Sequence, residues 1–199
     1  MQLNFLNFII SFFVLNTFNF AQDTLIFSDI NGIIAVEAEH FYSQEKNLRR
    51  QWYSQTLDSS QDIQPDLDSN HSTTASNEAY LEILPDTRVT HNDSLVHGVS
   101  FSDIPGILGI ISYKVNFNKS GRYYVWVRAY SSGTEDNGIH VGIDGTWPKT
   151  SKKMQWCDGK NSWYWESKQR TDANHCGEPY KIFLDVKEHG VHTISFSMR

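Results

Sequence analysis

The 199-residue sequence has little cysteine, proline or basic charge: two Cys, five Pro, and 17 Lys and Arg against 23 Asp and Glu. With a net charge of −6 and no basic stripe, we expect no nucleic-acid partner and no binding to anionic membranes. The H-E-x-x-H, G-x-S-x-G and phosphate-loop motifs of common catalytic sites are also missing. No base, nucleophile and orienting group come together in the sequence, so we expect a protein that is not an enzyme.

The first residues form an apolar stretch that differs from the rest of the chain. Residues 6–20 read LNFIISFFVLNTFNF, which is short and Asn-interrupted for a transmembrane helix. The stretch fits the apolar region of a signal peptide over residues 1–21, cleaved before Gln22, although no Lys or Arg precedes it. A membrane anchor or a buried segment is the alternative. We expect a secreted, periplasmic or cell-surface protein with a short linker over 22–30 and one domain over 31–199.

Cysteine usage agrees with export. Cys157 and Cys176 flank an aromatic loop, and a pair at this spacing is expected to form a disulfide in an oxidising compartment. Two free buried thiols are the alternative. Two Cys do not make a zinc site, even with His175 beside Cys176.

The chain after residue 31 alternates short β-type runs with polar turns, without a long helical period or an internal repeat. Strands are expected over 33–39, 79–84, 109–117, 122–130, 139–145, 182–186 and 191–198. Residues 54–77, rich in Ser, Asp, Gln and Asn, are expected to form a long loop. Many short strands predict an all-β fold, an antiparallel sandwich or jelly roll. Because the sequence stops at Arg199 directly after a strand, we expect this sandwich to lack its last strand.

The strand expected over 122–130 has two distinct faces. Alternation places Tyr123, Val125, Val127 and Ala129 on one face and Tyr124, Trp126, Arg128 and Tyr130 on the other. The second face is either a concave sugar-binding surface or a core face on which Arg128 pairs with a carboxylate. We favour the core.

Four tryptophans, Trp147, Trp156, Trp163 and Trp165, gather within nineteen residues. An exposed indole offers a flat platform for the apolar face of a sugar, while nearby amides and charges bond its hydroxyls. For any single Trp, core packing is the favoured alternative, but at least one is expected to be a platform. Trp163 and Trp165 would share one face of a strand. Asn137 and His140 are further candidate sugar ligands, although this cluster could simply build a turn.

Glu37 and Glu39 alternate with Ala38 in an expected strand, which would place both carboxylates on one face. Calcium accepts such pairs within its six to eight oxygen ligands. The alternatives are an exposed acidic face or, much less favoured, a catalytic pair, for which neighbours on one strand are too close.

The order of these runs resembles carbohydrate-binding modules of families 6 and 35 and the C-terminal domain of glycoside hydrolase family 115. The resemblance rests on VEAEHF over 36–41, SYKV over 112–115, GRYYVWVRA over 121–129, NGIHVGIDG over 137–145, WYW over 163–165 and HGVHTI over 189–194. It implies a galactose-binding-like jelly roll with a structural calcium at Glu37 and Glu39. It also implies a non-catalytic module that binds a polysaccharide or oligosaccharide beside an attached catalytic domain. The alternative is an accessory domain that docks on a glycoside hydrolase catalytic domain without binding sugar.

Overall fold

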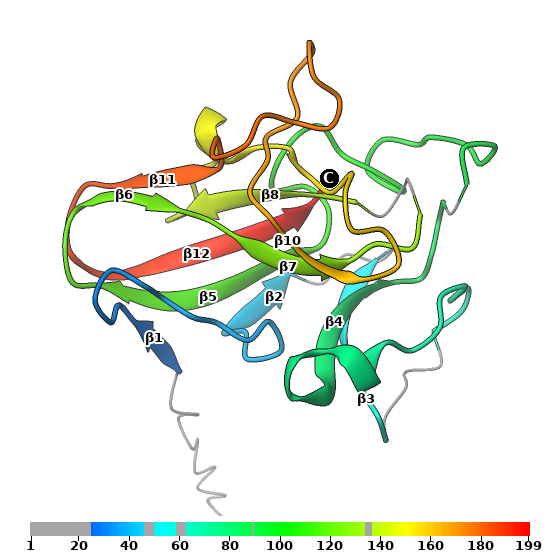
Figure 1. Ribbon diagram of the computed structural model, residues 1–199, viewed down its shortest axis with the longest axis horizontal. Coiled ribbons are helices and arrows are strands. Elements are labelled where there is room, and N and C mark those ends of the chain that lie inside the picture. Colours follow the sequence, from blue (N-terminus) through cyan, green and yellow to red (C-terminus); the bar gives the residue numbers. More distant parts are fainter. Residues whose placement is uncertain (1–24, 46–49, 59–62, 89, 134–136) are drawn as a thin grey trace, which may run out of the picture.

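The computed structural model describes residues 25–45, 50–58, 63–88, 90–133 and 137–199. Within these ranges the chain is all-β, with short strands in several mainly antiparallel sheets and three short 3-10 helices (Figure 1). None of the helices in the described part has the length and apolar character that a membrane crossing requires. The predicted signal peptide lies outside the described residues.

The largest sheet is six-stranded, in the order β1–β5–β12–β8–β9, with β2 also pairing with β5. Its strands are β1 (Ile26–Ser28), β2 (Ser43–Glu45), β5 (Ile110–Phe117), β8 (Gly138–Ile143), β9 (Met154–Gln155) and β12 (Gly190–Met198). All these pairings are antiparallel except that of β1 with β5. Every second residue of β5 is buried, as expected of a strand with one face on the core.

Three two-stranded sheets complete the fold. They pair β3 (Gln51–Thr56) with β4 (Ala79–Leu84), β6 (Gly121–Tyr124) with β11 (Phe183–Val186), and β7 (Val127–Tyr130) with β10 (Trp163–Glu166). The 3-10 helices are η1 (Ser72–Thr74), η2 (Ser76–Glu78) and η3 (Lys149–Ser151). In Figure 1, β6 and β7 run in line across the six-stranded sheet.

The core lies between the six-stranded sheet and the strands β6, β7 and β11. Its buried members include Ile111, Tyr113, Val115 and Phe117 of β5, Val141, Trp156, Leu184 and Ile194. Tyr123, Val125, Val127 and Ala129 pack against this cluster. The opposite face carries Tyr124 and Trp126, which are 52% and 45% exposed, so the expectation that this face lies in the core is wrong.

Most strand predictions are confirmed, since 79–84, 109–117, 139–145, 182–186 and 191–198 match β4, β5, β8, β11 and β12 within a few residues. The strand predicted over 122–130 is interrupted at residues 125–126, between β6 and β7. The strand predicted over 33–39 does not form. Its Ile33 is 71% exposed. The predicted linker over 22–30 contains β1.

The disulfide prediction is confirmed, with 5.4 Å between the Cα atoms of Cys157 and Cys176. The bond closes a loop that contains the whole of β10, the strand that carries Trp163 and Trp165. It therefore limits how far β10 can move away from β7.

Candidate functional site

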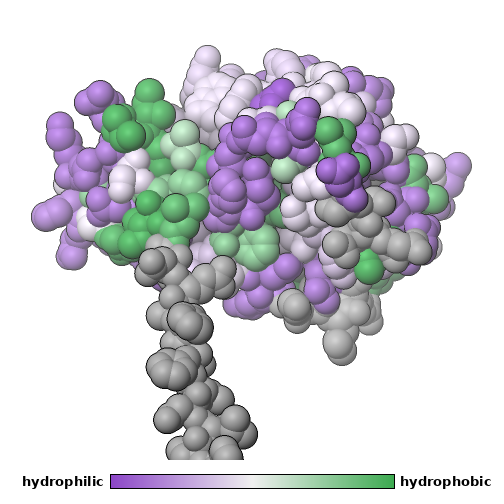
Figure 2. Space-filling model, turned by 90° about the horizontal axis from the view of Figure 1, so that it is seen from below, coloured by the Kyte–Doolittle hydropathy of each residue, from purple (hydrophilic) through white to green (hydrophobic). Residues whose placement is uncertain are grey.

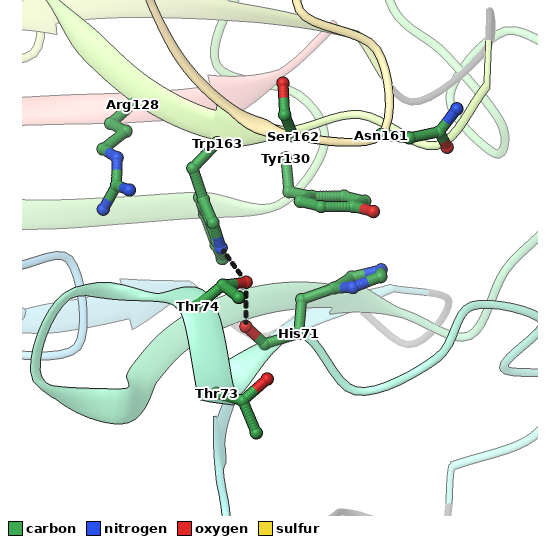
Figure 3. Close-up of a pocket in the computed structure, with 8 residues that line it drawn as sticks. All are labelled: His71, Thr73, Thr74, Arg128, Tyr130, Asn161, Ser162 and Trp163. Atoms are coloured by element: carbon green, nitrogen blue, oxygen red, sulfur yellow. Dashed lines mark hydrogen bonds between the residues drawn. The ribbon is translucent and has the colours of Figure 1, made fainter.

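A cleft of about 460 Å³ opens between the β7–β10 pair and the segment around η1 (Figure 3). It is lined by His71, Thr73, Thr74, Arg128, Tyr130, Asn161, Ser162 and Trp163. Figure 3 shows Arg128, Tyr130 and Trp163 on one side of the cleft and His71, Thr73 and Thr74 on the other. Segments far apart in the sequence thus build one concave site.

Trp163 forms the central wall of the cleft. It lies opposite Tyr130 in the β10–β7 register, so the two side chains share a face and their ring centroids are 5.7 Å apart. The Trp163 indole nitrogen donates to the Thr74 hydroxyl over 3.2 Å, and that hydroxyl donates to the carbonyl of His71. The edge contact with Tyr80, at 5.5 Å, also holds the ring. The half-buried indole is therefore fixed in orientation before any ligand arrives.

The second aromatic pair of the cleft is His71 stacked on Tyr130. Their ring centroids are 3.6 Å apart and their planes differ by 19°. The His71 Nε2 atom is buried and has no hydrogen-bond partner in the described structure. An unpaired buried nitrogen carries a desolvation cost that a polar group or a water beside it would relieve.

Arg128 supplies the positive charge of the cleft. Its guanidinium carbon lies 5.4 Å from the centroid of the Trp163 ring, within the range of a cation–π interaction. Asn161 and Ser162, on the same side of the cleft as Tyr130 and Trp163, are exposed in the turn that leads into β10 (Figure 3). The Asn161 backbone has φ of 57°, a conformation that Asn tolerates better than most residues. A flat ring, a guanidinium and a polar rim together suit a ligand with an apolar face and many hydroxyls.

The other three tryptophans have different surroundings. Trp165 is 57% exposed and shares a face with Arg128, but it does not line the cleft. The half-buried ring of Trp147 packs so closely on Gly106 and Gly142 that a methyl group at either position would collide with it. Trp156 is only 2% exposed and its indole nitrogen donates to the carbonyl of Tyr164. Trp156 thus has a core role, which corrects its prediction as a sugar platform.

Asn137 and His140 are also buried, at 7% and 0% exposure, which corrects their prediction as sugar ligands. The His140 Nδ1 atom accepts from the backbone N–H of Lys153 over 3.0 Å, so Nε2 carries the proton and donates to the Ser102 carbonyl over 2.9 Å. Burial lowers the pKa of His140 to about 4. The carbonyl of Asn137 accepts from the backbone N–H of Trp156 over 2.9 Å. Both residues serve to hold the segment over 151–156, which contains β9, against β8.

Glu37 and Glu39 lie in a segment without strand structure, so no strand geometry aligns their carboxylates. The Glu37 carboxylate accepts from the Ser76 hydroxyl over 2.9 Å. Among the described residues there is no group of three or more His, Cys, Asp or Glu that could hold a metal ion. Two carboxylates fall short of the six to eight oxygens that calcium takes. Calcium binding at Glu37 and Glu39 therefore stays a prediction, and the proposed function does not use it.

A larger hollow of about 1770 Å³ adjoins the cleft and shares His71, Arg128, Tyr130 and Trp163 with its lining. It is lined by core-facing residues of β5 and β12, by β4, by β6 and β7, and by the segment over 31–39. In the described ranges, β4, β6 and β7 each pair with only one neighbouring strand, so each keeps an unpaired edge. Figure 2 shows hydrophobic side chains gathered where the described chain begins. Exposed apolar residues in the first part of the described chain are Leu25, Ile26, Ile30, Ile33 and Val36.

Sequence reasoning missed the contribution of His71, Thr73 and Thr74. The one signal for them was the long polar loop over 54–77, because long loops in compact domains are often functional. Arg128 and Tyr130 were predicted to lie on a core face, and Asn161 and Ser162 were not among the predicted sugar ligands.

Fold and cleft together define an all-β protein with an aromatic and polar surface cleft. No protein-family model matches the chain. No solved structure matches it either. The chain is 56% identical over 187 residues to "Uncharacterized protein P23" of Formosa agariphila. The match covers 92% of this chain and 45% of that protein, so the chain spans about half the length of this relative.

Proposed function

We propose that this protein is a secreted, non-catalytic carbohydrate-binding module whose cleft around Trp163 takes a segment of a polysaccharide or oligosaccharide. In this proposal, the six-stranded sheet and the β6–β11 and β7–β10 pairs are the two layers of a jelly-roll sandwich. The resemblance of the strand motifs to family 6 and family 35 modules supports it.

The observation that carries the proposal is the fixed orientation of the Trp163 indole on the wall of a polar cleft. The hydrogen bond to Thr74 and the ring contacts with Tyr80 and Tyr130 hold the indole without covering it completely. Sugar binding by a ring fixed in advance loses little conformational entropy. The nearby Asn161, Ser162 and Thr73 can donate to and accept from hydroxyl groups.

Calorimetric titration of the protein against a panel of soluble polysaccharides tests this function. We expect saturable binding to one or more members, and about a tenfold or greater loss of affinity in Trp163→Ala, because an aromatic platform contributes more than 1 kcal/mol. The matched control is Trp165→Ala, which removes an exposed indole of the same strand from outside the cleft and should keep the affinity. A folded wild-type protein that binds no member of the panel would contradict the proposal.

The hollow beside the cleft favours a second function, docking on another polypeptide. Its wall combines apolar core residues with the unpaired edges of β4, β6 and β7. An extended segment with alternating apolar side chains would pair with these edges and fill the space, as in β-strand addition. This is the accessory role expected as the alternative to sugar binding.

If the hollow is a docking site, Leu81→Lys, a change in β4 where it lines the hollow, should abolish binding of a partner domain. Saccharide binding should persist in this variant. The partner to use is the part of the Formosa relative that lies outside the match, and isothermal titration calorimetry measures its binding. Unchanged binding of that part by Leu81→Lys, or no binding by the wild type, would argue against docking through the hollow.

A further inference from the structure

We propose that the ligand of the cleft is an acidic saccharide, one that carries a carboxylate or a sulfate, and that Arg128 binds this group. The inference rests on the proposed saccharide function of the cleft. It concerns the chemical class of the ligand, which the resemblance in sequence does not fix.

Arg128 has no acidic partner in the described part of the chain, whereas Arg122, Arg199 and Lys168 each have one. Arg122 pairs with Asp185 at 2.8 Å, Arg199 with Asp103 at 3.2 Å, and Lys168 with Glu166 at 3.0 Å. In the described part of the chain, Arg128 forms no salt bridge within 4.0 Å. The contact found for it is the one with the Trp163 ring. Arg128 also lines the neighbouring hollow, and none of the described carboxylates there forms a salt bridge with it. These carboxylates belong to Asp29, Glu37, Glu39, Asp68, Glu82 and Asp86.

The cleft itself is free of carboxylates, although the chain as a whole has a net charge of −6. Arg128 is the one fixed charge among its eight lining residues, and the others are neutral hydroxyl, amide and aromatic groups apart from His71. A half-buried guanidinium in such surroundings has lost part of its hydration without gaining a counter-charge. An anionic ligand would supply that counter-charge, whereas a neutral sugar would not.

The geometry of the guanidinium also matches an oxyanion. Arg presents a planar fork of N–H donors that bonds carboxylates, sulfates and phosphates through two parallel hydrogen bonds. Trp163 limits the positions of that fork, because the guanidinium lies over the indole ring. A sugar ring beside the Trp163 indole would therefore present an equatorial or exocyclic anionic group to Arg128, while its hydroxyls reach Asn161 and Ser162.

Two matched pairs of polysaccharides test the inference by calorimetry at low salt. One pair is polygalacturonate and its methyl-esterified form, and the other is a sulfated galactan and its desulfated form. We expect the charged member of at least one pair to bind about tenfold more tightly or better, as charge-assisted hydrogen bonds do. The pair that shows the difference distinguishes a carboxylate from a sulfate ligand. Added salt should weaken binding of that charged member alone.

The variants are Arg128→Gln and its control Arg122→Gln, which makes the same charge change at an exposed position already paired with Asp185. Arg128→Gln should remove the preference for the charged member, and Arg122→Gln should keep it. Arg128→Lys keeps the charge without the fork and should retain only part of the preference, which guards against misfolding of the Gln variant. Equal affinity of wild type for both members of each pair overturns the inference but leaves saccharide binding intact. Binding to neither member of either pair also overturns the inference, and the wider panel of polysaccharides then decides whether the saccharide function stands.

Discussion

The imidazole of His71 lies flat on the phenol ring of Tyr130, with ring centroids 3.6 Å apart. This contact joins a loop that precedes β4 to the end of β7, and both rings belong to the lining of the cleft. The cleft therefore exists only when the loop over 63–78 packs against the β7–β10 pair.

We expect His71→Ala to weaken saccharide binding about tenfold, because loss of the stack frees the wall that carries Thr73 and Thr74. Thermal stability should fall by only a few degrees, since both rings are only partly buried. Tyr130→Phe keeps both rings and is the control that should bind like wild type. Unchanged affinity of His71→Ala would show that the η1 segment does not shape the site.

The disulfide offers a second test of how the cleft is held. We expect the double variant Cys157→Ser and Cys176→Ser to lose about 3 kcal/mol of unfolding free energy, because the bond closes a loop with a sequence separation of 19 residues. Saccharide affinity should fall as well, since that loop contains β10. Urea denaturation and calorimetry measure the two effects. Equal stability of the wild type with and without reductant would contradict the prediction.

The buried His140 predicts loss of stability in mild acid. Its pKa is about 4 in the folded protein and near 6.5 when unfolded, so the unfolded chain binds the proton more readily between these values. Stability is therefore lost as the pH falls from 6.5 towards 4, by at most about 3 kcal/mol. The added proton would occupy Nδ1, which accepts from the N–H of Lys153. His140→Gln should be less stable at pH 7 but show a flatter dependence on pH over this range in urea denaturation.

Protonation of Glu82 should make the stability of the protein depend on pH in the opposite direction. Burial, with the negative charge of Asp66 adding to it, raises the pKa of Glu82 to about 7. Folding thus favours the protonated carboxyl, and stability decreases as the pH rises through 7. We expect Glu82→Gln to be more stable than wild type at pH 8 and equal to it at pH 4. Asp172→Asn, at an exposed position, controls for the loss of one negative charge. A destabilised Glu82→Gln at pH 8 would contradict this account.

The sequence predicted the strands whose alternation matches one buried face. Ile111, Tyr113, Val115 and Phe117 of β5 are every second residue, and the structure buries all four. The segment over 33–39 has a similar apolar pattern but no edge to pair with at β5, because β12 occupies one side of that strand and β1 and β2 occupy the other. Strand propensity without an available neighbour does not make a strand.

The candidate site was only partly predictable. Sequence pattern placed Trp163 among the platforms, but it could not separate Trp163 from Trp156, since both lie in similar aromatic and polar surroundings along the chain. Their difference arises from tertiary packing, which places Trp156 against β8 and Trp163 at the surface. Likewise, His71 reaches the cleft because a long loop folds back onto the β7–β10 pair. The local sequence has no periodic pattern from which this position could be predicted.

The most direct test of saccharide binding in the cleft follows the indole N–H signals of the six tryptophans by NMR during titration with the tightest-binding polysaccharide fragment of the panel. Trp163→Phe assigns the Trp163 signal. We expect a saturable shift of that signal with little change for the buried Trp156 or for Trp165 outside the cleft. A binding-competent protein whose Trp163 signal stays unchanged while Trp165 or another indole shifts would contradict it.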